Sequence, residues 1–312
     1  MIHEGTRRGD IRGSLFRFFF VFIRVTSWMI HFPTGECPMS ERSNPDKLRL
    51  AVLISGSGTN LQALLDRQAA GRLAAEVVVV ASDRADAFGL GRARQAGIPT
   101  HIVDYRAYLQ RELPSPLKLD LPVDLEGLAR RQKILTMPDS DKLLQRLARL
   151  VLAEDALIRA LAHYQPDYVC LAGFMRLVSP YFLCHYNRAG QWRVINIHPA
   201  LLPAFPGQHG YDDTIGYGCK WGGITVHFAD EGEDTGPIIA QAVYPIWPED
   251  DPETVRRRGL TLEYEVYAQC INWLAAGQVL LQTLSGQRTG TRITDPAYRT
   301  VLKDWLELAL SR

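Results

Sequence analysis

Three polar side chains in the second half of the sequence are the strongest candidates for catalysis. Asn196 and His198 lie two residues apart in the segment VINIHPALLPAFP, and strand geometry places both on the same side of the chain. Asp234 begins a later apolar segment and could supply the carboxylate that orients the histidine. This set suits acyl transfer to an amine, because Asn196 and a protonated His198 would stabilise the oxyanion. Asp234 would keep His198 cationic and accept the proton that the attacking amine sheds.

The histidines also have interpretations without catalysis. A histidine at the end of a strand is often structural, so the residue types alone leave the role of His198 open. His227, in the segment ITVHF with Thr225 on the same face, could support the site or belong to the core. A metal site is a further alternative, with His198, His209, His227 and Asp234 as its candidate ligands. Their spacing matches no compact ligand pattern, so we predict no metal.

A glycine-rich turn near residue 57 is a candidate phosphate-binding site. It follows the apolar run 48–55 and precedes a helical pattern over 61–70. Backbone N–H groups in such a turn bind a phosphate together with the positive end of the helix dipole. The residues that we assign to this role are Ser57, Gly58, Thr59 and Asn60.

The same turn has two other interpretations. A G-x-G pattern also begins dinucleotide-binding folds, and Asp83 ends the next strand, where a ribose-binding acid would stand. Leu61 and Gln62 occupy the positions at which a dinucleotide site needs glycine, which favours a single phosphate. A tight turn without any ligand is the remaining alternative.

Apolar runs that alternate with helical patterns predict an α/β fold with a doubly wound, mostly parallel sheet and right-handed crossovers. We expect strands at 48–55, 76–81, 100–103, 167–171 and 193–197, and helices at 61–70, 84–97, 154–164 and 253–276. The β-branched run EVVVVA at 76–81 is typical of a strand that is covered on both faces. Two further strands, 224–228 and 237–245, flank the acidic loop 229–236 and predict an antiparallel addition at the sheet edge.

We expect one catalytic domain over residues 48–280. Four prolines and many charges at about 105–140 predict an insertion on the surface, whose basic pair Arg130 and Arg131 would be solvated. The tail 281–312 carries no pattern that we interpret. Residues 1–47 form an N-terminal extension that we expect to be disordered, or to include a misassigned start, with translation beginning at Met39.

The composition argues against several classes of partner. Lys and Arg total 35 against 34 for Asp and Glu in 312 residues, so no global field favours nucleic acid or an anionic membrane. Arg17 and Arg24 break the aromatic run at 15–25, which is also too short to cross a bilayer. Five widely spaced cysteines without a C-x-x-C pair predict a reducing, cytoplasmic compartment. The sequence indicates no oligomeric state.

Six motifs occur together in this chain. They are SGSGTN at 55–60, ADAFGLGRARQAG at 85–97, AGFMRL at 172–177, NIHPALLP at 196–203, TVHF at 225–228 and DTGP at 234–237. In kind and order they resemble the phosphoribosylglycinamide formyltransferases, the folate-dependent family of purine synthesis. The resemblance covers about residues 48–104 and 154–276, and the combination of N-I-H-P-x-L-L-P with D-x-G-P is specific.

The resemblance implies a Rossmann-like formyltransferase fold, with 10-formyltetrahydrofolate as donor cosubstrate and glycinamide ribonucleotide as acceptor. The expected products are formylglycinamide ribonucleotide and tetrahydrofolate. The resemblance places Asn196, His198 and Asp234 at the catalytic positions. It assigns the ribonucleotide to Ser57, Gly58, Thr59 and Asn60, on the phosphate, and to Glu263, on the ribose hydroxyls. It assigns the folate to Met175, Arg176, Leu177, Asp230, Glu231, Gly232 and Glu233, with Arg176 on the glutamate tail.

The chain departs from the family pattern at three places. The connection at 105–140 is longer than usual, so the family's folate-tail contacts in this part are not carried over. The sequence His209-Gly210-Tyr211 stands where the family has H-x-H. About four residues near 187–190 are additional.

Other functions remain as alternatives. A formyltetrahydrofolate deformylase would release formate without an amine acceptor, and it usually has a different residue after its histidine. A methionyl-tRNA formyltransferase carries an additional C-terminal RNA-binding domain, for which little chain follows Ala276. A non-catalytic folate-binding or nucleotide-binding module could use the same fold. A dinucleotide-dependent oxidoreductase is the last alternative. It would require the glycine turn to bind a dinucleotide instead of a single phosphate.

Overall fold

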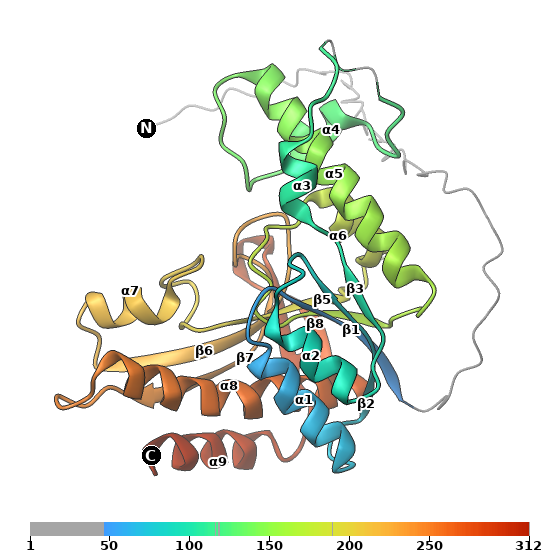
Figure 1. Cartoon of the computed structure of the whole chain (residues 1–312). Helices are drawn as coiled ribbons and strands as arrows, with labels where there is room; N and C mark the ends of the chain where they lie inside the picture. Colours follow the sequence, from blue (N-terminus) through green and yellow to red (C-terminus); the bar gives the residue numbers. More distant parts are fainter. Residues whose placement is uncertain (1–46, 116, 118, 189, 312) are drawn as a thin grey trace, which may run out of the picture. The chain divides into compact units, whose positions relative to one another are not determined.

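The computed structural model describes residues 47–115, 117, 119–188 and 190–311, which are coloured by sequence in Figure 1. The expected N-terminal extension therefore lies outside the described residues, apart from Lys47. In the part of the chain that is described, no helix is both long and apolar enough to cross a membrane.

The central sheet has seven strands in the order β3-β2-β1-β4-β5-β6-β7. The strands are β1 (Leu48–Ile54), β2 (Ala75–Ser82), β3 (Thr100–Ile102), β4 (Tyr168–Leu171), β5 (Val194–His198), β6 (Trp221–Phe228) and β7 (Ile238–Pro245). The first five are parallel, whereas β6 is antiparallel to both β5 and β7. The prediction of a doubly wound, mostly parallel sheet with an antiparallel edge addition is confirmed.

The order of the strands reverses between β1 and β4, and ligands of open α/β sheets bind outside the carboxyl ends of the strands at such a point. The loops that leave these two strands are joined to each other. Ser55 N donates to Gly173 O at 3.1 Å, and Met175 N donates to Ser55 Oγ at 2.8 Å. The glycine turn and the segment AGFMRL are therefore held side by side at the crevice.

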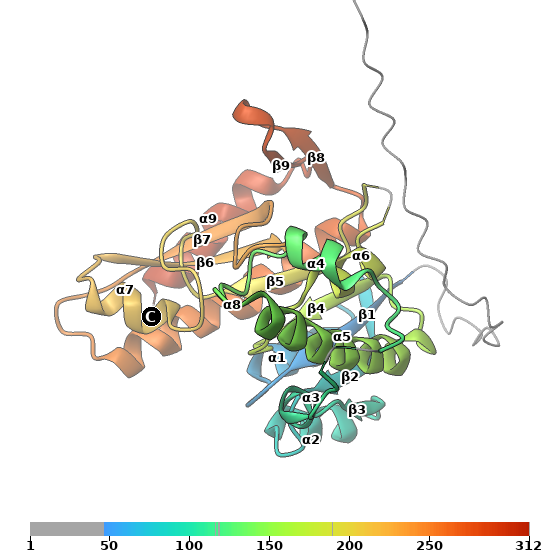
Figure 2. The ribbon, with the colours of Figure 1, turned by 90° about the horizontal axis from the view of Figure 1, so that it is seen from above.

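Two groups of helices cover the two faces of the sheet (Figures 1 and 2). One face carries α1 (Thr59–Ala69), α2 (Phe88–Gln95), α8 (Pro252–Ala275) and α9 (Tyr298–Leu310). The other face carries α3 (Tyr105–Gln110), α4 (Leu125–Arg131), α5 (Ser140–Ala162) and α6 (Pro180–Tyr186). Both faces of β1 and β2 are thus buried, which explains why their sequences are apolar without alternation.

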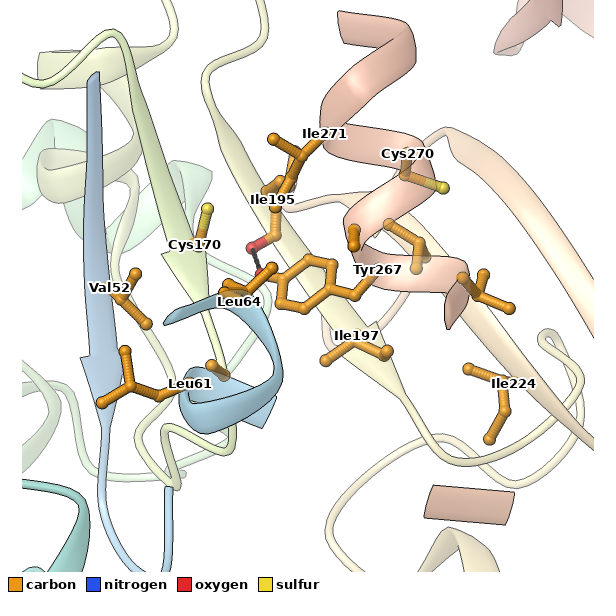
Figure 3. Packing of buried hydrophobic residues seen from close by; sticks show 14 of the residues in the cluster. Val52, Leu61, Leu64, Cys170, Ile195, Ile197, Ile224, Tyr267, Cys270 and Ile271 are labelled. Atoms are coloured by element: carbon orange, nitrogen blue, oxygen red, sulfur yellow. Dashed lines mark hydrogen bonds between the residues drawn. The ribbon is translucent and has the colours of Figure 1, made fainter. Parts of the chain in front are cut away.

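The core under α1 and α8 ties these helices to the middle of the sheet. Figure 3 shows Tyr267 of α8 among Leu61 and Leu64 of α1 and the strand residues Val52 and Ile195. The Tyr267 hydroxyl is buried and is placed to donate to the carbonyl oxygens of Leu171 and Ile195, at 3.1 and 3.3 Å. This contact satisfies a polar group in the core and fixes α8 beside the carboxyl ends of β4 and β5.

Two helices begin at residues other than those expected. α1 begins at Thr59 instead of 61, because Gly58 is left-handed (φ 67°) and turns the chain directly into the helix. α2 begins at Phe88 instead of 84, after a turn in which Arg84 N donates to Ser82 Oγ. The two helix starts touch through glycine: a Cβ on Gly58 would lie 2.6 Å from the Cα of Gly89.

The segment 105–140, expected as a surface insertion, contains α3 and α4. Tyr105 and Leu128 are buried in the core under α5, at 1% and 4% exposure. α5 itself begins at Ser140, well before the expected residue 154, and Asp139 caps it by accepting from the backbone N–H of Asp141 and Lys142. The segment is therefore anchored to the domain by apolar contacts.

The tail after residue 280, in which we interpreted no sequence pattern, contributes to the core. The hairpin of β8 (Val279–Thr283) and β9 (Thr289–Ile293), joined through the 3-10 helix Ser285–Gln287, is followed by α9. Thr291 Oγ1 of β9 donates to Ile238 O of β7 at 2.5 Å. Trp305 of α9 is 5% exposed and lies edge-on to Trp273 of α8, with the ring centroids 5.7 Å apart.

Candidate active site

Asn196 and His198 both lie at the carboxyl end of β5, as predicted, and Asp234 lies on the loop 229–236 between β6 and β7. Because β5 pairs with β6, the register places Asn196 opposite His227 and His198 opposite Thr225. The sheet therefore brings a second histidine to the site. His198 and His227 are both buried, at 3% and 2% exposure.

The carboxylate of Asp234 is the centre of the polar contacts. Its Oδ1 accepts from Asn196 Nδ2 at 3.2 Å and lies 3.4 Å from His227 Nε2. Its Oδ2 accepts from the backbone N–H of Gly207 at 2.8 Å and lies 3.3 Å from His198 Nδ1. The three predicted catalytic residues thus converge on one point, and His227 joins them.

Each histidine is also oriented by a backbone carbonyl. His198 Nε2 lies 2.7 Å from Phe205 O, and His227 Nδ1 lies 2.9 Å from Phe228 O, so both nitrogens carry protons. In a neutral His227 the proton is on Nδ1, and Nε2 is then free to accept from the Asn196 amide at 3.2 Å. For His198, the nitrogen that faces Asp234 is Nδ1.

Burial and neighbouring charge shift the pKa of His198 in opposite directions, and the same is true of the pKa of Asp234. Burial lowers the pKa of His198 below its ordinary value, although the neighbouring carboxylate of Asp234 acts to raise it. The pKa of Asp234 lies below its ordinary value: burial acts to raise it, but the His227 contact, the His198 charge and the Gly207 N–H together outweigh burial. Asp234 is therefore an anion at neutral pH, and His198 is a buried imidazole beside a fixed negative charge.

The backbone at this site is in an uncommon conformation at two places. Asp234 and Phe205 have left-handed φ angles of 53° and 54°, which cost of order 1–3 kcal/mol for residues other than glycine. Two contacts compensate this cost. The Gly207 N–H donates to the Asp234 carboxylate, and the Phe205 carbonyl accepts from His198. The loops that follow β5 and β6 are thus held against each other by the residues of the site.

The predicted phosphate turn lines a separate cavity with Glu263 of α8. Ser57, Gly58, Thr59, Asn60 and Glu263 all border it, and its volume of about 790 Å³ suits a small-molecule ligand. Glu263 is buried: its Oε2 accepts from Asn60 Nδ2 at 2.6 Å and its Oε1 accepts from the Tyr211 hydroxyl at 2.5 Å. Burial raises the pKa of Glu263, and these two donors oppose that shift.

A second cavity contains the catalytic set and adjoins the first. It is lined by Asn196, His198, Asp234 and His227 and by most of the residues expected to bind folate, namely Met175, Arg176, Leu177, Asp230, Gly232 and Glu233. The two cavities have in common Gly173, Met175, Arg176, Ile197, Pro199 and Gln208. Two ligands bound in these cavities would therefore meet next to the end of β5.

Two of the predicted residues have protein partners that the sequence did not reveal. Arg176 Nε donates to Asp83 Oδ2 at 2.5 Å, and the Asp83 side chain is only 1% exposed. Glu231 does not line the catalytic cavity, since it pairs with Arg131 of α4 at 2.5 Å. Both members of the basic pair expected to be solvated are exposed, Arg130 at 70% and Arg131 at 55%, and Arg131 in addition makes this contact.

The two residues predicted as possible support have different positions. His227 is part of the catalytic cavity, whereas Thr225 lines neither cavity. The Thr225 hydroxyl is fully buried; it donates to Ala200 O at 2.7 Å and accepts from Leu202 N and Gln241 Nε2 at 3.1 and 3.0 Å. Thr225 therefore fixes the loop after β5, which carries the carbonyl of Phe205.

Three contributors to the site have no strong sequence signal. Tyr211 of α7 (Gly210–Gly216) holds Glu263, and the backbone groups of Phe205 and Gly207 orient His198 and Asp234. Backbone contacts cannot be inferred from residue types. Tyr211 lies in the stretch where the chain departs from the pattern of the family that it resembles, so no motif pointed to it. Among the residues that the structure describes, no group of three or more His, Cys, Asp or Glu side chains is arranged to hold a metal ion.

Comparisons with known proteins identify relatives of this chain. The model of the formyl transferase family matches residues 48–271. The chain is 35% identical to the phosphoribosylglycinamide formyltransferase of Escherichia coli (strain K12) over 80% of this chain and 98% of the relative. It is 38% identical, over 75% of its own length, to the trifunctional purine biosynthetic protein adenosine-3 of Drosophila pseudoobscura pseudoobscura, of which it spans 14%. The solved glycinamide ribonucleotide transformylase 1 from Symbiobacterium toebii has a TM-score of 0.61 and 37% identity, over 83% of this chain and all of that chain.

Proposed function

The chain belongs to the formyl transferase family, and we propose that Asn196, His198 and Asp234 carry out the transfer that it catalyses. A formyl group passes from 10-formyltetrahydrofolate to the amine of glycinamide ribonucleotide, in the synthesis of purines. The observation that carries the assignment of residues is the convergence of Asn196, His198 and His227 on the Asp234 carboxylate, where two ligand cavities adjoin.

The reaction needs a site for the charge that develops on the formyl oxygen. The amine nitrogen attacks the formyl carbon, and the C=O electron pair moves to the oxygen. We assign the stabilisation of this oxyanion to Asn196 and His198, because each preorganised donor contributes about 3 to 4 kcal/mol in such sites. The Asn196 amide makes two contacts of 3.2 Å to protein partners, at the long end of the hydrogen-bond range, so a substrate oxygen can replace one of them.

The reaction also needs an acceptor for a proton. The attacking amine becomes cationic when its bond to carbon forms, and it must lose a proton before the carbon–N10 bond breaks. We assign the acceptance of this proton to the Asp234 carboxylate, directly or through water, with delivery to N10 of the departing tetrahydrofolate. The form of His198 that stabilises the oxyanion is the protonated one, which the Asp234 carboxylate 3.3 Å from its Nδ1 favours until that carboxylate takes up the proton of the amine.

The two cavities support one ligand assignment each. We assign the ribonucleotide phosphate to the turn Ser57–Asn60 at the N-terminus of α1, where backbone N–H groups and the helix dipole favour an anion. Glu263 would then accept from the ribose hydroxyls. We assign the folate to the cavity that holds Met175, Leu177 and the loop 230–234. Arg176, which Asp83 holds at the boundary of both cavities, would meet the glutamate tail.

We further propose that the protein works in the reducing cytoplasm without a metal. The four cysteines in the described part of the chain are free, and two of them, Cys170 and Cys270, are buried in the core. No step of the mechanism above requires a Lewis acid, since protein donors and the Asp234 carboxylate supply the charges and the proton acceptor.

The test of this function is whether loss of the formyl group from the donor depends on the acceptor. We expect the absorbance change of 10-formyltetrahydrofolate to require glycinamide ribonucleotide, with formation of one formylated product per donor consumed. Formate release at the same rate without the ribonucleotide would instead indicate a deformylase. Tight folate binding without turnover in either condition would indicate a binding module.

A further inference from the structure

The segment 105–140 lines the catalytic cavity with one side chain, Ile134, and contacts the loop that carries Asp234 with another, Arg131; no motif assigns either residue to the site. Ile134 lines the cavity that contains Asn196, His198 and Asp234. Arg131, at the end of α4, donates from Nη2 to Glu231 Oε1 at 2.5 Å, and Glu231 precedes Asp234 by three residues on the same loop. An insertion that lay only on the surface, away from the site, would make neither contact.

The part of this segment that carries the two residues is held in place locally. Leu128 of α4 is buried against α5 and α6. The Gln132 side chain closes the turn that follows: its Oε1 accepts from Ile134 N and Leu135 N at 3.0 and 2.7 Å, and its Nε2 donates to Leu135 O at 3.0 Å. Ile134 is thus presented to the cavity from a fixed turn rather than from a free loop.

The loop 229–236 is held from its other side by the C-terminal hairpin. Arg288 Nη2 donates to Thr235 O at 3.1 Å. Within the loop, Asp230 Oδ1 accepts from Gly232 N and Thr235 Oγ1, at 3.1 and 2.6 Å. Arg131 supplies a contact from α4, so the loop that carries Asp234 is bonded both to α4 and to the hairpin.

We propose that the segment 105–140 forms one wall of the formyl-donor site. Ile134 contacts the ring system of the bound folate, and Arg131 is a positioning residue that holds the loop 229–236 in its binding conformation through Glu231. This inference rests on the proposed function, because it takes the catalytic cavity as the folate site. It predicts effects on the donor that spare the ribonucleotide, since neither residue lines the phosphate-turn cavity.

The first test removes the ion pair between Arg131 and Glu231. Arg131→Ala should raise the KM for 10-formyltetrahydrofolate about two- to fivefold, the range expected for a partly exposed pair, and leave the KM for glycinamide ribonucleotide unchanged. Arg131→Glu should raise it further, because two carboxylates would then face each other. The double variant Arg131→Glu with Glu231→Arg should return the donor KM most of the way to the wild-type value. A general defect in folding would not allow this recovery.

Arg130→Ala is the matched control. Arg130 is the neighbouring arginine on α4, is 70% exposed, and makes only 3.8 Å ion pairs with Asp124 and Glu126 of its own helix region. Its removal should change neither KM nor kcat. The comparison separates the contact of Arg131 from a general effect of losing positive charge on α4.

The second test shortens the apolar side chain of Ile134 in the wall of the donor site. Ile134→Ala should raise the donor KM and the Kd of tetrahydrofolate about tenfold, since an apolar side chain in a binding pocket contributes 10-fold effects or more. Ile134→Val should retain most of the affinity, and Lys133→Ala, at the exposed neighbouring position, should retain all of it.

The outcomes distinguish this inference from the proposed function. If the wild type transfers the formyl group but Arg131→Glu and Ile134→Ala keep its donor KM and tetrahydrofolate Kd, the segment is not part of the donor site. The same conclusion follows if these variants raise the KM for both substrates equally. If the wild type shows no acceptor-dependent transfer, the proposed function itself is wrong. The Kd of tetrahydrofolate for wild type and Ile134→Ala then still tests whether the segment 105–140 forms a wall of the folate site.

Discussion

Replacing Asp234 with asparagine removes one charge from the site and changes little else. The variant side chain keeps an oxygen for the N–H of Gly207, and its amide can donate to His227 Nε2, while the bond that Oδ1 accepts from the Asn196 amide is lost. The shape of the site and its links between loops should therefore persist. What is lost is the anion beside His198 and the acceptor for the proton of the amine.

The size of the effect follows from the distance between the charges. Oδ2 of Asp234 and Nδ1 of His198 are 3.3 Å apart. At an effective dielectric constant of about 20, the attraction between a carboxylate and an imidazolium at this separation is about 5 kcal/mol. Desolvation of the buried pair offsets part of it, and a loss of about 3 kcal/mol from the transition state corresponds to roughly 10²-fold in kcat.

The assay is steady-state formyl transfer at saturating concentrations of both substrates, with thermal unfolding to verify that the variant folds. We expect kcat to fall by about 10²-fold or more, while both KM values stay within about threefold of wild type, because the charge acts mainly in the transition state. A correctly folded variant that keeps more than a third of the wild-type kcat would show that Asp234 is not the acid–base and electrostatic partner described here.

Three further predictions concern binding and stability. Glu263→Gln should raise the KM for glycinamide ribonucleotide about tenfold and spare the donor KM in two-substrate kinetics, because an amide group would face the Asn60 or Tyr211 donor. Burial raises the pKa of Glu154 from 4.5 to about 8, so the folded protein holds a proton that the unfolded chain releases as the pH rises between these values. Above pH 6.5, where the lowered pKa of His185 no longer acts in the opposite direction, the unfolding free energy of wild type should therefore decrease up to pH 8 in urea titrations, and Glu154→Gln should flatten this slope. Trp305→Ala should lower the unfolding free energy by about 3–5 kcal/mol without changing kcat, because Trp305 fills the core between α8 and α9 and lines neither cavity.

The sequence predicted the layered sheet well, because the strands of a doubly wound fold have distinct apolar runs. β2 is buried along nearly its whole length, and the corresponding run EVVVVA was recognised as a covered strand. The start of α2 was misplaced because charged residues at 84 and 86 fit a helical pattern equally well, and only the close approach of Gly89 to Gly58 fixes where the helix begins.

The positions of Asn196 and His198 could be predicted because both lie on one strand, where the spacing of two residues determines the face. Asp234 lies 36 residues after His198, and its place opposite the histidine depends on the pairing of β5 with β6. The ion pair of Arg131 with Glu231 spans 100 residues and two loops, so no local pattern could indicate it. Trp305 was missed for a related reason: its partner Trp273 lies on α8, and the helix that carries Trp305 follows the last of the family motifs.

The central claim is that the site at the end of β5 transfers a formyl group to glycinamide ribonucleotide through His198. A single-turnover reaction with donor labelled by carbon-13 in the formyl group, followed by mass spectrometry of the ribonucleotide, tests it in wild type and His198→Ala. The account predicts quantitative transfer of the label by wild type, and a rate at least 10²-fold lower in His198→Ala at unchanged occupancy of both substrates. Transfer at a comparable rate in the variant, or label that leaves wild type only as formate, would contradict it.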